Sequence, residues 1–252
     1  MQIVGLSTGR VRPKAATRGI RRYLPGGWRD TTEPVNVFAV THPDGVLVFD
    51  TGQSAAAARP GFLPWWHPYL RLARFELTQA DEAAAQLERL GIDPSAVRWV
   101  VLSHLHTDHV GGLAAFSRAE VVVSEGEWDR ARGLGGRLRG YVRRQWPAGL
   151  SPRLARLDGP SVGPFPHSED LAGDGRLMLV PTPGHTVGHI SLLVRTAAST
   201  YLLAGDLVHT GADMEAVAPD IATYCSANDV VVLATHDPAA LDLVKSLSAA
   251  RS

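Results

Sequence analysis

The stretch VRWVVLSHLHTDHVGGL, residues 97–113, decides how this chain is organised. Its first six residues, Val97 to Leu102, are apolar and rich in β-branched side chains, a pattern that predicts a buried strand. Four groups able to bind a metal follow that strand directly: His104, His106, Asp108 and His109. Burying imidazoles and a carboxylate together costs free energy unless they are hydrogen-bonded or coordinated, and a metal ion supplies that coordination. The stretch therefore predicts a metal site where a strand ends.

The spacing of these groups favours two metal ions over one. His104 and His106 are two residues apart and can point into one site. Asp108 and His109 can turn towards a second, adjacent site. The glycines at 111 and 112 allow the backbone to turn closely past the ligands. A two-metal hydrolytic centre is the leading interpretation.

Four further motifs occur in the chain: Asp50-Thr51-Gly52, the stretch PGHTVGH at 183–189, Gly205-Asp206 and Thr235-His236-Asp237. Together with HLHTDH and its following glycines, they resemble in kind and order the signature of the metallo-β-lactamase superfamily. The resemblance extends over roughly residues 35 to 238. It implies an α/β (α+β) fold, a four-layer αββα sandwich that carries its site at the sheet edges. We expect one hydrolase domain over residues 1–252.

The resemblance also implies a role for each candidate ligand. It assigns to the first metal His104, His106 and His185. It assigns to the second metal Asp108, His109 and His236, with Asp206 bridging the two ions. It places Asp50 and His189 beside the ligands as supporting residues. Histidine-rich ligand sets with carboxylates suit zinc, so two divalent ions, most simply Zn²⁺, are expected, with iron, cobalt or manganese as alternatives.

Within the superfamily, the pattern most resembles the N-acyl-homoserine lactonases. His106 stands where flavodiiron oxidoreductases carry glutamate, and Asp206 supplies a bridge that serine- or cysteine-bearing β-lactamases lack. Only about fifteen residues follow His236, too few for the C-terminal helical domain of glyoxalase II enzymes. The implied activity is quorum quenching, in which a metal-bridging hydroxide opens a lactone ring. Hydrolysis of another ester, a thioester or a phosphotriester stays open, as does a non-catalytic metal-binding regulatory protein.

Two residues are candidates for catalysis beyond holding metals. Asp108 can carry a proton to the leaving group. His209 stands where many of these lactonases have a tyrosine, three residues after the bridging aspartate, and a neutral imidazole there can donate a hydrogen bond to the substrate carbonyl. Between residues 54 and 76, large apolar side chains lie among prolines, and they form either a local core or a wall for the substrate's tail: Phe62, Trp65 and Trp66.

Charge and composition exclude several classes of partner. The chain has 25 basic and 25 acidic residues, so no overall field favours nucleic acid or an anionic membrane. No run of 18 apolar residues is seen, so we expect no transmembrane helix, and no signal peptide is seen at the start of the sequence. The lone Cys225 fits a reducing compartment. We expect a cytoplasmic enzyme with a small-molecule lactone or ester substrate, and a homodimer stays open.

The basic segment at 10–22 is expected to be a solvated loop, and the arginine-rich segment at 133–156 a mobile or amphipathic insertion, mostly solvated.

Overall fold

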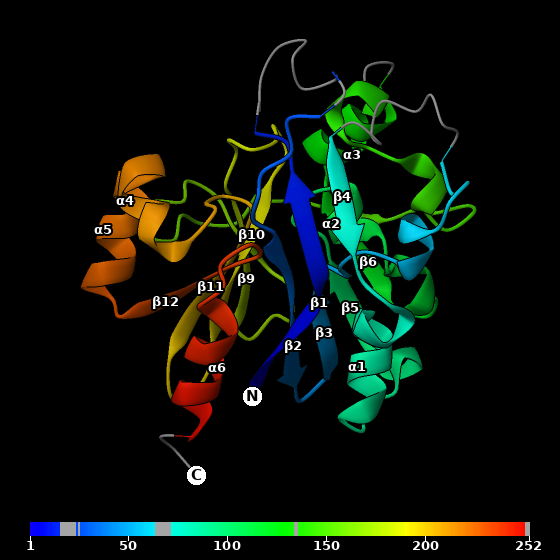
Figure 1. Cartoon of the computed structure of the whole chain (residues 1–252). Helices are drawn as coiled ribbons and strands as arrows, with labels where there is room; N and C mark the ends of the chain where they lie inside the picture. Colours follow the sequence, from blue (N-terminus) through cyan, green and yellow to red (C-terminus); the bar gives the residue numbers. More distant parts are fainter. Residues whose placement is uncertain (16–23, 25, 64–71, 134–135, 250–252) are drawn as a thin grey trace.

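Two β-sheets pack face to face in the computed structural model, which describes residues 1–15, 24, 26–63, 72–133 and 136–249 (Figure 1). The first sheet has the strand order β4-β1-β2-β3-β5-β6-β7. Its strands are β1 (Ile3–Pro13), β2 (Glu33–His42), β3 (Gly45–Phe49), β4 (Ala73–Glu76), β5 (Val97–Val101), β6 (Glu120–Ser124) and β7 (Arg153–Ala155). The second sheet has the order β12-β11-β10-β9-β8. Its strands are β8 (Glu169–Asp170), β9 (Leu177–Pro181), β10 (Ile190–Arg195), β11 (Thr200–Gly205) and β12 (Val230–Ala234).

Helices cover the outer face of each sheet. Beside the first sheet lie α1 (Ala83–Arg89), α2 (Thr107–Val110) and α3 (Glu125–Arg132). Beyond the second sheet lie α4 (Met214–Val217) and α5 (Pro219–Ala227), while α6 (Ala240–Ala249) packs against β1 and β12. Figure 1 shows these four layers side by side. The arrangement is the αββα sandwich that the resemblance implied.

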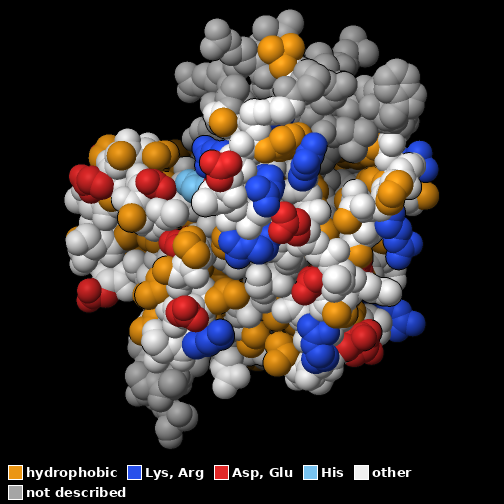
Figure 2. Space-filling model, in the orientation of Figure 1, with side chains coloured by type: hydrophobic (Ala, Val, Ile, Leu, Met, Phe, Trp, Pro, Cys, Tyr) orange, Lys and Arg blue, Asp and Glu red, His pale blue; other side chains and the backbone are white. Residues whose placement is uncertain are grey.

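Three apolar cores hold the layers together, because each sheet buries both of its faces. Between the sheets, Phe38, Phe49 and Val101 meet Leu179 and Leu192. A second core fills the space under α1 and the insertion that follows α3. A third lies between the second sheet and the helices α4 and α5. No described helix is long and apolar enough to cross a membrane. On the face drawn in Figure 2, acidic and basic side chains are interspersed.

The strand predicted over Val97 to Leu102 is present as β5, but the expectations for two basic segments need correction. Arg10 and Arg12 lie within β1 and not in a loop, since β1 runs on to pair with β4; residues 16–22 of that segment lie outside the described residues. The described part of the segment at 133–156 is amphipathic, as one of the expectations had it, with Arg139, Arg143 and Arg144 exposed, but it is not mostly solvated, because Tyr141, Val142 and Gln145 are buried. Tyr141 packs into the outer core of the first sheet, which removes its large apolar ring from water.

The ends of four strands place the candidate site. β3 and β5 pair in parallel in the first sheet, as do β11 and β12 in the second, so the carboxyl ends of each pair lie at one edge. The residues that follow these strands are linked across the sandwich, since Ile190 N–H donates to the Ser103 carbonyl at 3.0 Å and Asn36 N–H to the Thr235 carbonyl at 2.9 Å. Loops beyond fixed strand ends are suited to carry functional side chains.

Candidate metal centre

Seven side chains from the two halves of the chain meet at this edge. His104 and His106 lie in the loop after β5, and Asp108 and His109 lie in the single turn of α2. His185 lies between β9 and β10, Asp206 directly follows β11, and His236 follows β12. These are the residues that the sequence predicted as ligands, and the structure brings all of them together in three overlapping groups.

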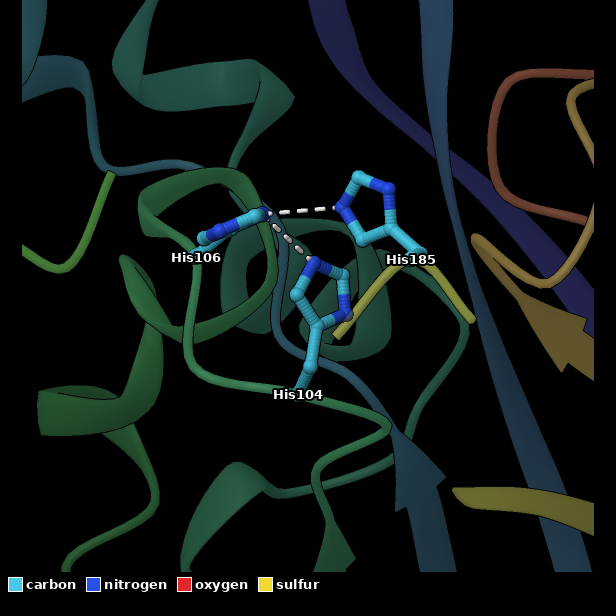
Figure 3. A group of neighbouring side chains, drawn as sticks. All are labelled: His104, His106 and His185. Atoms are coloured by element: carbon cyan, nitrogen blue, oxygen red, sulfur yellow. Dashed lines mark hydrogen bonds between the residues drawn. The ribbon is translucent and has the colours of Figure 1, made fainter. Parts of the chain in front are cut away.

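The first group, His104, His106 and His185, we call the histidine set. His104 Nε2 and His185 Nε2 each lie 3.0 Å from His106 Nδ1 (Figure 3). Figure 3 shows the three rings turned towards one another, His104 and His106 from the loop after β5 and His185 from the loop between β9 and β10. Three ring nitrogens aimed at one point are arranged as ligands of a single cation are.

The second group, Asp108, His109 and His236, we call the mixed set. His236 Nε2 lies 3.7 Å from Asp108 Oδ2. Asp206 lies between the two sets. Its Oδ1 is 3.3 Å from His109 Nε2 and 3.5 Å from His236 Nε2, while its Oδ2 is 3.4 Å from His185 Nε2 and 3.9 Å from His104 Nε2. One carboxylate oxygen therefore faces each set.

The protonation states of His104, His106 and Asp206 fit divalent metal ions. Burial, reinforced by neighbouring imidazoles, holds the pKa of His104 and of His106 well below the usual range, so both rings offer lone pairs. Burial opposes ionisation of Asp206, but His109 and His236 outweigh it and hold the pKa of that carboxyl well below its usual range. His109 Nε2 and Asp206 Oδ1 are buried, yet neither makes a hydrogen bond within the described residues. A cation between them would satisfy both atoms.

Asp50 supports the mixed set from behind. Its Oδ2 accepts a hydrogen bond from His109 Nδ1 at 2.8 Å, which leaves His109 Nε2 facing Asp206. Asp50 in turn accepts from the N–H and the hydroxyl of Ser103, each at 2.8 Å. A carboxylate behind a metal-binding histidine fixes the ring and makes it a stronger ligand. His236 is held similarly by the Pro34 carbonyl, 2.8 Å from its Nδ1.

His189 supports Asp206 through the backbone. Its Nε2 accepts the Asp206 N–H at 3.1 Å, and its Nδ1 lies 2.8 Å from the Thr182 hydroxyl. Burial lowers the pKa of His189 to about 3, so the ring is neutral and Nε2 keeps its lone pair. Gly205 has φ +54°, and a Cβ there would lie 2.7 Å from Ser103 Cβ and 2.8 Å from His189 Nε2. The glycine thus lets β11 deliver Asp206 close to its supports.

Sequence reasoning missed the residues that support the histidine set. The Arg139 backbone hydrogen-bonds His106, Gly140 packs on the His106 ring, and the Tyr141 ring lies 5.1 Å from it. Glu127 in α3 is fully buried, and its Oε1 accepts the Leu105 N–H at 2.9 Å, between the two histidines. These groups reach the site from 20 or more residues further along the chain.

A cavity of about 350 Å³ opens over this cluster of side chains. Its described lining has an apolar side formed by Val11, Pro13, Leu72 and Ala73, and a polar side that includes Glu33 and His209. Phe62 does not line this cavity: it packs with Leu63 and Phe75 and borders an adjacent cavity. Trp65 and Trp66, the other candidates for a substrate wall, lie outside the described residues.

Curated relatives and solved structures resemble this chain over most of its length. The N-acyl homoserine lactonase AttM of Rhizobium radiobacter is 32% identical over 236 residues, which covers 84% of this chain and 85% of the relative. An N-acyl homoserine lactonase of a Bacillus species is 30% identical over 187 residues, 74% of this chain and 68% of the relative.

Among solved structures, an N-acyl homoserine lactone hydrolase with the product N-hexanoyl-L-homoserine at its catalytic metal centre matches with a TM-score of 0.72. The alignment covers 98% of this chain and 97% of that one at 20% identity, and it bears on the fold alone. The family model of the metallo-beta-lactamase superfamily matches residues 30–229. With the sandwich and the ligand cluster already described, these matches show that the chain belongs to the metallo-beta-lactamase superfamily.

Proposed function

We propose that this chain is a two-metal hydrolase that opens the lactone ring of N-acyl homoserine lactones, with zinc as its resident metal. The observation that carries the proposal is the position of Asp206, which turns one oxygen towards each ligand set under a cavity with an apolar side. The AttM relative is named as an N-acyl homoserine lactonase. Because both halves of the chain supply ligands to one centre, we propose that they act as a single hydrolase domain.

Ring opening adds a water oxygen to the carbonyl carbon, breaks the ring C–O bond and delivers a proton to the departing alkoxide. Divalent ions held by the two sets would supply Lewis acidity, which polarises a carbonyl and makes water acidic enough to yield a nucleophile near neutral pH. Asp108 lines the cavity and is suited to hand the proton to the alkoxide. Val11, Pro13 and Leu72 offer an apolar surface for an acyl chain and exclude water beside the reacting group.

The experiment is a metal and substrate assay on the purified chain. We expect about two transition-metal ions per chain, loss of activity on chelation and recovery with zinc. Turnover can be followed with a pH indicator, since each opened ring releases a proton from the new carboxylic acid. N-acyl homoserine lactones, simple γ-lactones, aryl esters and a phosphotriester form the panel. Full activity in metal-free protein, or metal-loaded protein that opens no lactone, would overturn the proposal.

A further inference from the structure

We propose that Glu33 fixes His209 with its proton on Nε2, so that Nδ1 accepts a hydrogen bond from the amide N–H of the substrate and sets specificity for N-acylated lactones. This inference rests on the proposed function. His209 Nε2 lies 3.0 Å from Glu33 Oε1, and both residues line the cavity over the ligands. The Glu33 side chain is 15% exposed and that of His209 is 46% exposed, so the pair has a protected carboxylate and an accessible ring.

The His209 ring has a second contact, and its two partners are themselves held in place. It stacks on the His236 ring, with centroids 5.6 Å apart and planes 30° apart. Glu33 is held in turn by Arg29, whose Nη1 donates to the same Oε1 at 2.8 Å. The next residue, Pro34, places its carbonyl 2.8 Å from His236 Nδ1. The first two residues of β2 therefore position both stacked rings.

The charge on Glu33 decides which nitrogen of His209 carries the proton. Arg29 Nη1 and His209 Nε2 both face Glu33 Oε1, at 2.8 Å and 3.0 Å, and the positive charge of Arg29 favours the carboxylate, so the carboxylate is the form that faces Nε2. A carboxylate only accepts hydrogen bonds, so Nε2 must be the donor. In a neutral imidazole the other nitrogen then carries a lone pair. Among the described residues, none is found to bond His209 Nδ1.

This assignment differs from the role that the sequence predicted for His209. A tyrosine hydroxyl can donate to a carbonyl, and the sequence suggested that the imidazole replaces it in that way. With Nε2–H donated to Glu33, a neutral ring has no proton left for a carbonyl. The neutral ring has a hydrogen-bond acceptor at Nδ1. In an N-acyl homoserine lactone, the amide N–H is the group that can donate to it. A γ-lactone with a plain alkyl chain has no such donor.

The experiment compares two substrates in four metal-loaded proteins: wild type, Glu33→Ala, His209→Ala and the double variant. On an N-acyl homoserine lactone, each single variant should lower kcat/KM by roughly three- to tenfold, the range for one neutral hydrogen bond. The double variant should be no worse than His209→Ala, because Glu33 acts through His209. On an alkyl γ-lactone of equal chain length, all four proteins should agree within about twofold. Glu33→Gln should recover most of the loss, since its amide oxygen also accepts from Nε2–H.

A second readout does not depend on activity. Long-range proton–nitrogen NMR spectra of the zinc-loaded protein should show His209 protonated at Nε2, and a mixture of tautomers in Glu33→Ala. Glu76→Ala is the matched control, because Glu76 pairs with Arg12 on neighbouring strands and does not line the cavity. It should leave both substrates and the His209 signals unchanged.

Three results would overturn the inference: additive losses in the double variant, equal losses on both lactones, or a proton on Nδ1 alone in the wild type. Equal losses on both lactones would return His209 to the role of a donor to the carbonyl. Failure of the proposed function is distinct from all of these, because wild-type protein would then open neither lactone.

Discussion

The histidine set and the mixed set differ in charge, in exposure and in what stands behind them. The histidine set presents three ring nitrogens, and its His185 side chain is 36% exposed. The mixed set includes a carboxylate, and the side chains of His109 and His236 are 0% and 9% exposed. Behind His109 stands the Asp50 carboxylate, whereas behind His106 stands a backbone carbonyl of the insertion.

The difference predicts that the two metal positions differ in metal affinity and in contact with the substrate. Anionic ligands and an anionic support strengthen the attraction for a divalent cation, and burial reduces screening of that attraction. The mixed set should therefore retain its metal more firmly. The histidine set is more open to the cavity and is better placed to meet a substrate, at the cost of weaker retention. Asp206 turns one carboxylate oxygen towards each position.

The largest effect is expected from Asp206→Asn, because it removes the carboxylate shared by the two sets. Both metals should bind more weakly, and kcat/KM should fall by more than the roughly 100-fold upper range for loss of a supporting residue. Metal analysis by mass spectrometry and lactone kinetics measure the two quantities. The control is Asp44→Asn at the β2–β3 turn. The Asp44 carboxylate faces His42, and neither residue belongs to the two sets. Retention of two metals by Asp206→Asn would rule out a bridging role.

Asp50→Asn should weaken the mixed set selectively. Asparagine tolerates the left-handed backbone at this position, where φ is 60°, and its oxygen can still accept from Ser103. It loses the second carboxylate oxygen that holds His109. Loss of such a support costs roughly 10–100-fold in metal affinity. Competition with a zinc-binding dye should show one weakened site and one of nearly unchanged affinity. Equal weakening of both sites would show that the two positions do not behave independently.

The sequence singled out the seven clustered side chains and also Asp50 and His189 beside them, but not the groups behind the histidine set, and the reason is chain distance. Four ligands are packed into HLHTDH, and short motifs at strand ends deliver the other three. Glu127 was not singled out in the sequence: it lies at the start of a helix, where Ser124 Oγ accepts its N–H at 3.2 Å. In the structure this side chain is buried and accepts the Leu105 N–H. Nothing local indicates that contact, because it depends on how β6 and β5 align.

The insertion after α3 shows the same limit. Arginines and glycines are typical of a solvated loop, and no local pattern places Gly140 on the His106 ring. Only the tertiary fold brings Tyr141 into the outer core and the neighbouring backbone onto the histidine set. The four-layer fold was predicted through the resemblance of the ordered motifs to the metallo-β-lactamase superfamily, and the family model and the strand order agree with it.

Gly140→Ala should disturb the histidine set alone, with a smaller effect. A Cβ at this position would lie 3.0 Å from His106 Cδ2 and 3.3 Å from its Nε2. The ring must shift, so we expect up to about a tenfold loss of affinity at that metal position, the lower range for a disturbed support. Gly149→Ala is a matched control: it has a similar left-handed φ (+73° against +95°) but no atom within 4 Å of its Cβ. Both variants carry backbone strain. Similar metal losses in both would attribute the effect to strain rather than to the ring.

The smallest effect on activity is expected at His189, which supports the Asp206 backbone and touches no metal position directly. In His189→Gln, the amide oxygen can reach the position of Nε2 and accept the Asp206 N–H, so turnover should stay within a few-fold of wild type. The variant should differ in its stability as pH changes. Burial lowers the pKa of His189 to about 3 in the folded protein. In the unfolded chain a histidine titrates near its ordinary value of about 6.5.

Between these two pKa values the unfolded chain binds a proton at His189 that the folded chain does not, so the free energy of unfolding decreases as pH falls below about 6.5. The decrease reaches up to about 1.4 kcal/mol per pH unit for one such group. Glutamine does not titrate, so wild type should lose stability more steeply than His189→Gln between about pH 6.5 and pH 5. Histidines common to both proteins cancel in the difference between their slopes. Urea unfolding of the two metal-loaded proteins at several pH values measures this difference in slope. Parallel slopes would mean that His189 is protonated in the folded state, and its Nε2 could then not accept the Asp206 N–H.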